Sequence, residues 1–150
     1  MNIKKGKTVL FLCAANVYRS RAAEALFNFY SKKDKLKCKA ESAALVYEDE
    51  PKNPLVEKVI KEKVTKKFMP KNSPKFINQY IIDRADLIVV MNVDLPSFLK
   101  QFHTKGKKII TWSIPDVVAY RYDFTKIPVF RKGISQIEEK VKELIKKLKQ

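Results

Sequence analysis

The chain has few of the residues that cross-link proteins or bind metals. Among its 150 residues are two cysteines, Cys13 and Cys38, and one histidine, His103. Two cysteines do not make a disulfide framework, and no Cys/His spacing typical of a metal site is present. Glycine occurs only three times, and there is neither an internal repeat nor a low-complexity stretch. These absences exclude collagen-like, disulfide-rich and zinc-finger classes, and they predict no metal site.

Long hydrophobic runs are absent as well. No apolar stretch approaches the roughly 20 residues that a helix needs to span a bilayer. Lysines before the apolar run at residues 9–13 imitate a secretory signal, but that run is short and continues into Asn-Val-Tyr-Arg-Ser rather than a cleavage site. We therefore expect a soluble, cytoplasmic protein. Its length and its 45% hydrophobic content fit one domain, residues 1–150, around one packed core.

Negative charge is scarce relative to positive charge. The chain has 32 lysines and arginines against 16 aspartates and glutamates, for a net charge of +16. Such a charge attracts polyanions, including nucleic acid, acidic membrane surfaces and phosphorylated proteins. The basic residues are spread along the chain, which favours a solvated lysine-rich surface over a dedicated polyanion site. We expect nucleic acid to bind only non-specifically, if it binds.

The hydrophobic pattern alternates between strands and helices. Short apolar runs predict strands at residues 8–13, 37–43, 86–91 and 108–111. Apolar periodicity and capping signals predict helices at about 19–31, 53–64, 73–84, 94–103 and 130–147. This order predicts an α/β fold in three layers, with four parallel strands and about five helices on both faces of the sheet. In such sheets ligands bind beyond the carboxyl ends of the strands, where Cys13 and the long 112–128 loop lie.

The stretch from Cys13 to Ser20 joins the first strand to the first helix. If this loop curls inward, its N–H groups and the helix N-terminus form an anion site. Arg19 adds a planar fork for two phosphate oxygens, and the positive surroundings stabilise a thiolate at Cys13. Ser20 could donate a hydrogen bond to that thiolate, and Asn16 tolerates the left-handed backbone that a tight loop requires. A lone cysteine is more often a buried core residue, but Cys-x5-Arg-Ser at a strand–helix junction favours a phosphate site.

Four blocks of the sequence resemble motifs of one protein family, and they occur in the same order as in that family. VLFLCAANVYRSRAAEALF, residues 9–27, looks like the phosphate loop of the low-molecular-weight protein tyrosine phosphatases and of the related arsenate reductases. The likeness continues with ESAALVYE at 41–48, DRADLIVVMN at 83–92 and WSIPD at 112–116, so it covers nearly the whole chain. The resemblance implies a flavodoxin-like sheet with strand order 2-1-3-4. It also implies phosphoester hydrolysis that needs no metal or other cofactor.

The resemblance also implies a role for each site residue. Cys13 would attack phosphorus to form a cysteinyl-phosphate, while Arg19 and the loop N–H groups hold the phosphate oxygens. Asp116 would protonate the leaving oxygen and then activate water, and inorganic phosphate would be both product and inhibitor. The residues implied to bind substrate or phosphate are Ala14, Ala15, Asn16, Val17, Tyr18, Ser20, Tyr47 and Tyr120. The partners would be tyrosine-phosphorylated proteins. Because the surface of the chain is basic, we expect it to favour phosphotyrosines in acidic sequences.

Two loop positions depart from the family pattern. Ala15 stands where the family usually has glycine, and a positive φ there would cost about 1 kcal/mol or more. Tyr18 stands where some members have a second loop cysteine, so the resemblance gives no support to local redox protection. Cys38 could serve as a resolving thiol, but we expect it to be a buried structural residue.

The general acid has two candidates in the sequence. The family shows Asp-Pro followed by aromatic residues, whereas this chain has Asp116 followed by Val117. Asp123, in the stretch YRYDF, is the rival, and we favour Asp116 because it lies in the matching WSIPD block. His103 is expected to be a solvated residue at a helix end and not a base.

Substrate preference depends on the residues around the loop. Tyr47 aligns with an aromatic residue that walls the substrate cleft in the family, although it could instead be a partly buried core tyrosine. Tyr120 could form the opposite wall. Val17 stands where tyrosine-directed members have isoleucine or valine and where phosphoarginine-directed relatives have threonine, which favours phosphotyrosine.

Two other functions are alternatives. An arsenate reductase of the same fold typically passes oxidation through a further pair of cysteines, which this chain does not have, although a variant using external thiols would not need them. A catalytically weak, phosphate-binding regulatory module is suggested by Ala15 and by the missing Asp-Pro. Substitution of Asp116 separates them, because an enzyme would lose rate whereas phosphate binding would survive.

Overall fold

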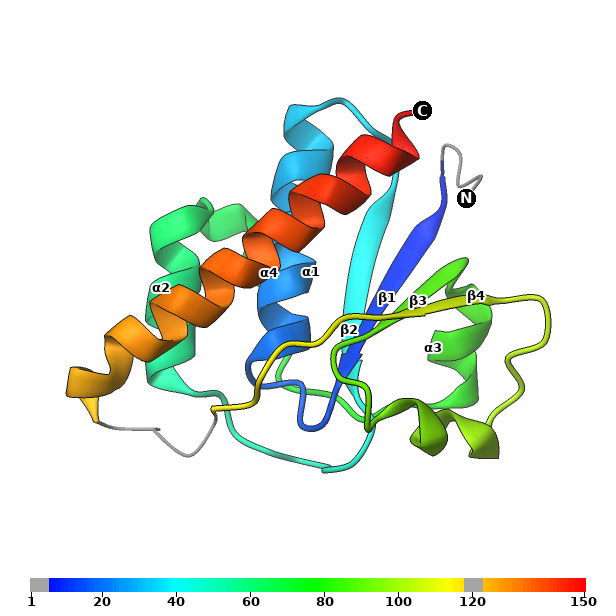
Figure 1. Ribbon diagram of the computed structural model, residues 1–150, viewed down its shortest axis with the longest axis horizontal. Helices are drawn as coiled ribbons and strands as arrows, with labels where there is room; N and C mark the ends of the chain where they lie inside the picture. The colour runs from blue at the N-terminus through cyan, green and yellow to red at the C-terminus, as the bar shows by residue number, and fades with distance from the viewer. Residues whose placement is uncertain (1–5, 118–122) are drawn as a thin grey trace.

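The computed structural model describes residues 6–117 and 123–150. Its sheet has the strands β1 (Thr8–Cys13), β2 (Lys39–Ala44), β3 (Leu87–Val90) and β4 (Lys108–Thr111). All three neighbouring pairs are parallel, and the strand order is β2-β1-β3-β4 (Figure 1). The predicted sheet order is therefore confirmed.

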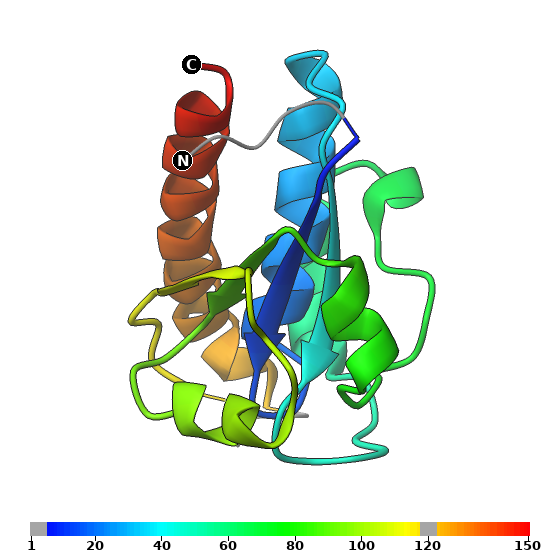
Figure 2. The ribbon, with the colours of Figure 1, turned by 90° about the vertical axis from the view of Figure 1, so that its right-hand side faces the viewer.

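Helices cover both faces of this sheet. The α-helices of the described residues are α1 (Arg19–Lys33), α2 (Pro54–Lys63), α3 (Gln79–Arg84) and α4 (Ile127–Leu148). The same residues also contain the 3₁₀ turns η1 (Lys66–Phe68), η2 (Pro96–Gln101) and η3 (Phe124–Lys126). The helices α1, α2 and α4 pack on one face, and α3 and η2 pack on the other (Figures 1 and 2). The three-layer α/β fold is thus confirmed.

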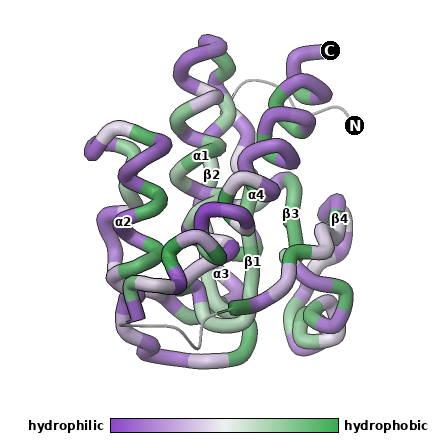
Figure 3. The backbone as a smooth tube through the Cα atoms, turned by 60° about the vertical axis from the view of Figure 1, so that its left-hand side comes forward, coloured by the Kyte–Doolittle hydropathy of each residue, from purple (hydrophilic) through white to green (hydrophobic). Residues whose placement is uncertain are grey.

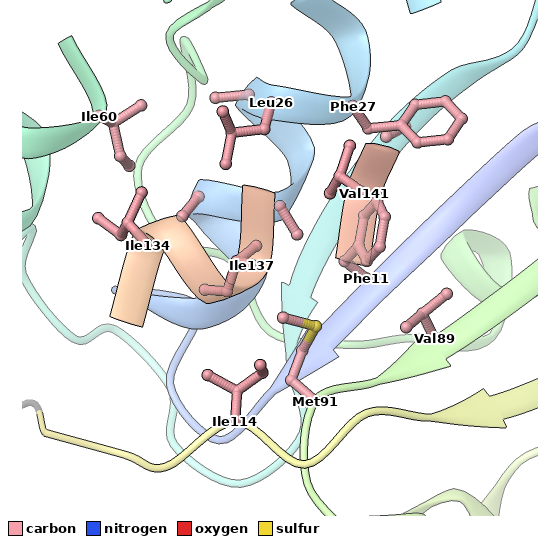
Figure 4. Close-up of a cluster of buried hydrophobic side chains, with 14 of the residues drawn as sticks. Phe11, Leu26, Phe27, Ile60, Val89, Met91, Ile114, Ile134, Ile137 and Val141 are labelled. Carbon is pink, nitrogen blue, oxygen red and sulfur yellow. The ribbon is translucent and has the colours of Figure 1, made fainter. Parts of the chain in front are cut away.

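The central strand β1 has apolar side chains on both faces. Val9 and Phe11 join the core beneath α1 and α4, whereas Leu10 and Leu12 join the core beneath α3. In Figure 4, Phe11 lies among side chains from β3, α1 and α4. Figure 3 shows the result in colour, with hydrophobic residues along β1 and β3 and an alternation of polar and apolar residues along α4. A strand packed on both faces has a fixed register, so the position of its last residue, Cys13, is fixed as well.

The cap that begins α2 agrees with the sequence prediction. The Asn53 side chain accepts hydrogen bonds from the N–H groups of Leu55 (2.9 Å) and Val56 (3.4 Å), and Pro54 occupies the first helical position.

The predicted helix start at Ser73 is wrong. Residues 75–77 are extended and form a parallel bridge beside β2, with Phe76 opposite Ala44. Ala44 N–H donates to the Lys75 carbonyl, and Ile77 N–H donates to the Ala44 carbonyl, both at 2.8 Å. Because this pairing needs an extended chain, α3 begins only at Gln79, after Asn78, whose side chain accepts from Ile81 N–H at 2.9 Å.

Several other boundaries also differ from the sequence prediction. The strands expected at 37–43 and 86–91 are Lys39–Ala44 and Leu87–Val90, and the helix expected at 19–31 ends at Lys33. The helix expected at 94–103 is the 3₁₀ turn Pro96–Gln101. The last helix begins at Ile127 rather than at residue 130, because Pro128 lies in its first turn, where proline is favourable. Within the described residues, no helix combines the length and the apolar character that crossing a membrane would require.

Candidate active site

The candidate site lies at the carboxyl edge of the sheet, where β1 gives way to the loop 14–18 and then to α1. Leu45 N–H donates to the Cys13 carbonyl at 2.9 Å, and the N–H groups of Val46 and Tyr47 both donate to the Ala14 carbonyl at 3.0 Å. These bonds bring the segment after β2 against the loop, so that two strand ends contribute to one site. Both loops lie at the lower end of the sheet in Figures 1 and 2. This is the edge at which parallel sheets bind ligands.

The sulfur of Cys13 faces Ser20 at the beginning of α1. Cys13 Sγ lies 3.0 Å from Ser20 Oγ and accepts a hydrogen bond from Ser20 N–H at 3.4 Å. Both donors come from the first turn of a 15-residue helix, whose N-terminus carries partial positive charge. Donors of this kind stabilise a thiolate more than a thiol.

Asn16 anchors the loop through hydrogen bonds of its side chain. It has a left-handed backbone with φ of 59°, and its side chain is 2% exposed. Its Nδ2 donates to Ser20 Oγ at 2.8 Å and to Ser42 Oγ at 2.9 Å, while its Oδ1 accepts from Lys75 N–H at 3.1 Å. Asn16 therefore ties the loop to α1, to β2 and to the segment beside β2.

These hydrogen bonds determine which way the hydroxyl protons point. Since Ser20 Oγ accepts from Asn16, its own hydrogen remains available for Cys13 Sγ. Ser42 Oγ likewise accepts from Asn16 and donates to Glu24 Oε1 at 2.6 Å. Burial raises the pKa of the Glu24 carboxyl, although the hydrogen bond from Ser42 opposes that shift. The network thus runs from a carboxyl group on α1 to the sulfur of Cys13.

The other residues of the loop contribute backbone groups to the site rather than large side chains. Val17 and Tyr18 are 2% and 1% exposed, whereas Ala14 and Ala15 are half-buried. Within the described residues, the N–H groups of residues 14–18 have no protein acceptor. Such N–H groups next to a helix N-terminus form an anion-binding site.

Arg19 and Asp116 meet on the open side of the loop. Arg19 is 3% exposed and donates through Nη1 to the Ile114 carbonyl at 3.1 Å. Its Nη2 lies 3.4 Å from Asp116 Oδ2, and the Asp116 side chain is 38% exposed. The segment after β4 therefore brings the predicted acid to the predicted phosphate-binding arginine.

The rival acid lies in a different setting. Asp123 precedes η3 and accepts hydrogen bonds from the N–H and the hydroxyl of Thr125. These bonds lower the pKa of Asp123, which is the opposite of what a proton donor requires. The geometry therefore favours Asp116. Tyr120, the predicted second wall, lies outside the described residues.

Tyr47 is not a core residue. It is 54% exposed and follows Val46 in the segment that hydrogen-bonds to the loop at Ala14. The alternative of a partly buried core tyrosine is therefore wrong, and the backbone of Tyr47 is joined to the loop.

A family model decides the relationship. The model for low molecular weight phosphotyrosine protein phosphatase matches residues 8–150. The chain belongs to this phosphatase family. No curated protein sequence matches the chain significantly.

Solved structures with the same fold include phosphatases and an arsenate reductase. A low molecular weight protein tyrosine phosphatase from T. tengcongensis is 24% identical with a TM-score of 0.79, and the match covers 95% of this chain and 100% of that one. A YwlE mutant from Bacillus subtilis is 20% identical with a TM-score of 0.81, covering 97% of this chain and 100% of that one. A second similar structure is a mutant of the YwlE arginine phosphatase with a phosphorylated active-site serine. An arsenate reductase in the phosphate-binding state is 21% identical with a TM-score of 0.70, covering 95% of this chain and 98% of that one. At these identities the likeness establishes the fold.

The departure from the phosphatase family at Ala15 does not strain the backbone. In the described part of the chain, the non-glycine residues with positive φ are Asn16, Lys35 and Asp49. The left-handed position of the loop is therefore Asn16, and the cost anticipated for Ala15 does not arise.

Cys38 and His103 lie away from the phosphatase loop. Cys38 is buried beside Lys39, which pairs with Thr8 at the opposite end of β1 from Cys13. At about 3.3 Å per residue the two cysteines are roughly 20 Å apart, too far for a disulfide. Burial raises the pKa of the Cys38 thiol, as expected for a structural cysteine. His103 is exposed at the end of η2, as predicted.

Several supporting residues were not found from the sequence. Ser42 and Glu24 belong to the loop network, and the Ile114 carbonyl orients Arg19. A Cβ at position 133 would overlap the Tyr18 hydroxyl, so the lack of a side chain in α4 makes room for the residue that precedes Arg19. Of these supporting residues, only Gly133 could have been noticed in the sequence, because a glycine inside an amphipathic helix is unusual. Among the described residues, no cluster of His, Cys, Asp and Glu side chains could hold a metal ion.

Proposed function

We propose that the protein hydrolyses aryl phosphate monoesters, with tyrosine-phosphorylated proteins as substrates, through a cysteinyl-phosphate intermediate. The observation that carries this proposal is the arrangement around Cys13. Its sulfur faces two donors from Ser20, and the loop that it opens ends on Arg19, 3.4 Å from Asp116. Residues suited to act as nucleophile, oxyanion clamp and proton donor thus lie close together, which supports the proposal.

In the first step the Cys13 thiolate attacks phosphorus, and the bond between phosphorus and the leaving oxygen breaks. The loop N–H groups and Arg19 hold the three equatorial oxygens as charge develops on them. Because a bound phosphate competes with Asp116 for the guanidinium of Arg19, the carboxyl group is released to give its proton to the leaving oxygen.

In the second step a water molecule attacks the cysteinyl-phosphate. The Asp116 carboxylate takes a proton from that water, the bond between sulfur and phosphorus breaks, and Cys13 leaves as the thiolate. The hydrogen bond from Ser20 makes this sulfur a better leaving group. The product, inorganic phosphate, fits the same loop and should inhibit competitively.

Two surface features support the choice of phosphotyrosine in an acidic context. Tyr47 is exposed beside the loop, where its ring can stack on the ring of a substrate. A hollow of about 650 Å³ between α2 and the 66–71 segment has lysine on most of its rim. Its charged and apolar lining residues are Lys52, Glu57, Lys61, Lys66, Lys67, Met69, Pro70 and Lys71. Because Glu57 is paired with Arg21, the lysine charge of this hollow attracts acidic peptides.

The two alternatives have less support. An arsenate reductase that relays oxidation within its own chain needs a second thiol near the first, and Cys38 is at the far end of β1. A regulatory module was suggested by Ala15 and by the missing Asp-Pro; the backbone has no strain at Ala15, so only the second ground remains.

The deciding experiment is hydrolysis of an aryl phosphate between about pH 5 and pH 7 with a chelator present. We expect turnover in the wild type and in Cys38→Ser, and none in Cys13→Ser, because serine is a poor nucleophile at this pH. Phosphate binding without any hydrolysis by the wild type would overturn the proposal and favour the regulatory module. Arsenate reduction with an added thiol, in place of hydrolysis, would favour the reductase.

A second comparison tests the substrate class. Matched peptides with phosphotyrosine in acidic or neutral contexts, and one with phosphoarginine, should be turned over in that order at low salt. Equal rates for the acidic and neutral peptides would remove the acidic preference, and a faster rate for phosphoarginine would contradict the proposed class. Raising the salt concentration should reduce the advantage of the acidic peptide.

A further inference from the structure

Arg21 is a buried charge close to the loop but outside the proposed chemistry. It lies in the first turns of α1, and its side chain is 1% exposed. Its Nε and Nη2 donate to the two carboxylate oxygens of Glu57 on α2, at 2.9 and 3.1 Å. Its Nη1 donates to the Asn72 carbonyl at 2.9 Å, and Nη2 also donates to the Pro70 carbonyl at 3.0 Å. One guanidinium therefore joins α1, α2 and the chain at residues 70–72.

We infer that Arg21 is a positioning residue for the reaction, which it affects by fixing the segment that orients Asn16. This inference rests on the proposed function. The segment that Arg21 holds continues to Lys75, whose N–H donates to Asn16 Oδ1 at 3.1 Å. Lys75 is tied to the sheet through its carbonyl, which accepts from Ala44 N–H. Arg21 fixes the other end of this short segment.

The orientation of the Asn16 amide depends on that segment. With Lys75 N–H on its Oδ1, the amide must present Nδ2 to Ser20 and Ser42. If the segment moves away, Oδ1 loses its donor and the amide is free to rotate. An amide oxygen turned toward Ser20 would accept the hydroxyl proton that otherwise points to Cys13. The thiolate would then lose one of its two donors.

The ion pair by itself does not explain why Arg21 is buried. A buried pair adds little net stability over well-packed apolar side chains, because both charges must be desolvated. What apolar side chains cannot supply is the pair of hydrogen bonds to the carbonyls of Pro70 and Asn72. Arginine can make these bonds and the bidentate bond to Glu57 together, because its planar fork carries five donors, whereas lysine cannot reach all of these acceptors.

The test uses the double variant Arg21→Met/Glu57→Leu, which removes the pair without leaving an unpaired buried charge. The matched control is Arg131→Met/Glu62→Leu. It removes another bidentate pair, with distances of 2.9 and 2.6 Å, which links α2 to α4 and does not touch residues 70–75. Every protein also carries Cys38→Ser, so that iodoacetamide reports Cys13 alone. The measurements are kcat and KM for an aryl phosphate, the rate of Cys13 alkylation at fixed pH, and thermal unfolding.

For the double variant we expect kcat about tenfold to a hundredfold lower, KM within about threefold of the wild type, and alkylation slowed severalfold. The control should match the wild type in all three. Unchanged kcat and alkylation in a folded double variant would overturn the inference and leave Arg21 with a structural role. If the double variant does not fold, Arg21→Lys takes its place, since it keeps the charge opposite Glu57 but cannot bond both carbonyls; normal kcat and alkylation in that variant would equally overturn the inference.

Alkylation separates this inference from the proposed function. If the wild type hydrolyses no phosphate ester, the proposed function fails, yet the alkylation rate still reports whether Arg21 controls the surroundings of Cys13. If the wild type is active and the double variant is equally active and equally reactive, only the inference about Arg21 fails.

Discussion

The loop that follows β1 and the segment that carries Asp116 meet at the same edge of the sheet, but they are held in different ways. Asn16, Ser20 and Ser42 are at most 2% exposed and are joined by hydrogen bonds of 2.8 and 2.9 Å. Asp116 is 38% exposed, and its contact with Arg19 is a looser 3.4 Å. The loop is held by buried hydrogen bonds within the protein, whereas the contact of Asp116 with Arg19 is one for which a phosphate would compete under the proposed function.

The proposed function gives the two regions different tasks. Holding a phosphate in its transition state requires donors that do not reorganise as charge develops, because reorganisation costs free energy. A proton donor must instead exchange its proton with water in each cycle, which requires some exposure. We call Asn16, Ser20 and Ser42 the buried half of the site and Asp116 its accessible half; under the proposed function the first stabilises charge and the second moves protons.

The largest expected effect comes from the accessible half. Asp116→Asn should lower kcat about 10²- to 10⁴-fold for a poor leaving group such as phenol, because general acid catalysis is lost. The loss should shrink for a good leaving group such as dinitrophenol, which departs without a proton. Steady-state rates over a series of aryl phosphates give the slope. Asp123→Asn is the control and should leave all rates near those of the wild type; a larger loss there than in Asp116→Asn would reverse the assignment.

The buried half should respond differently to the same series. Asn16→Ala removes three hydrogen bonds and places alanine at a φ of 59°. We expect kcat/KM to fall about a hundredfold, and by the same factor for every leaving group. The substitution impairs the positioning of the phosphate and of the Cys13 sulfur rather than proton transfer. A loss that depends on the leaving group as strongly as in Asp116→Asn would break the distinction between the two halves.

A third prediction concerns how the loop is anchored to α4. Gly133→Ala in an exposed helix would raise stability by about 1 kcal/mol. Here the added methyl group would overlap the hydroxyl of Tyr18, which is 1% exposed and packs edge-on against Phe130. We expect a loss of about 1–3 kcal/mol instead, measured by urea unfolding. Tyr18→Phe combined with Gly133→Ala should recover much of that loss, and if the double variant were no better, the overlap would not be its cause.

The sequence was informative where a local pattern coincides with a local structure. The strands Thr8–Cys13 and Lys108–Thr111 were predicted to the residue, and the Asn53 cap was recognised from its proline. The Ser73–Pro74 signal failed because a pairing with β2, about 30 positions earlier in the chain, competes with the helix. Such a pairing leaves no mark in the local periodicity.

The same division applies to the candidate site. Cys13, Arg19 and Asn16 lie within one loop, so spacing alone brought them together, and WSIPD supplied Asp116. Ser42 and Arg21 act through partners 26 and 36 to 51 positions away. Polar contacts of that range become visible only when the segments are packed, which is why the residues that support the loop were missed while the residues proposed to react were named.

The smallest expected effect is at the far end of the loop network. Burial raises the pKa of the Glu24 carboxyl, so the folded protein holds this proton more tightly than the unfolded chain does. The stabilising contribution of Glu24 is therefore fully present below the pKa of the unfolded chain and is lost as the pH rises through the raised pKa. Glu24→Gln keeps an oxygen for the Ser42 hydroxyl but cannot ionise, so its stability should exceed that of the wild type by up to about 1 kcal/mol at pH 8 and should not at pH 4. Urea unfolding at the two pH values measures this difference. If the free energy of unfolding depended on pH equally in both proteins, Glu24 would be as well solvated as an exposed carboxylate. Ser42 would then be the last buried member of the hydrogen-bond network.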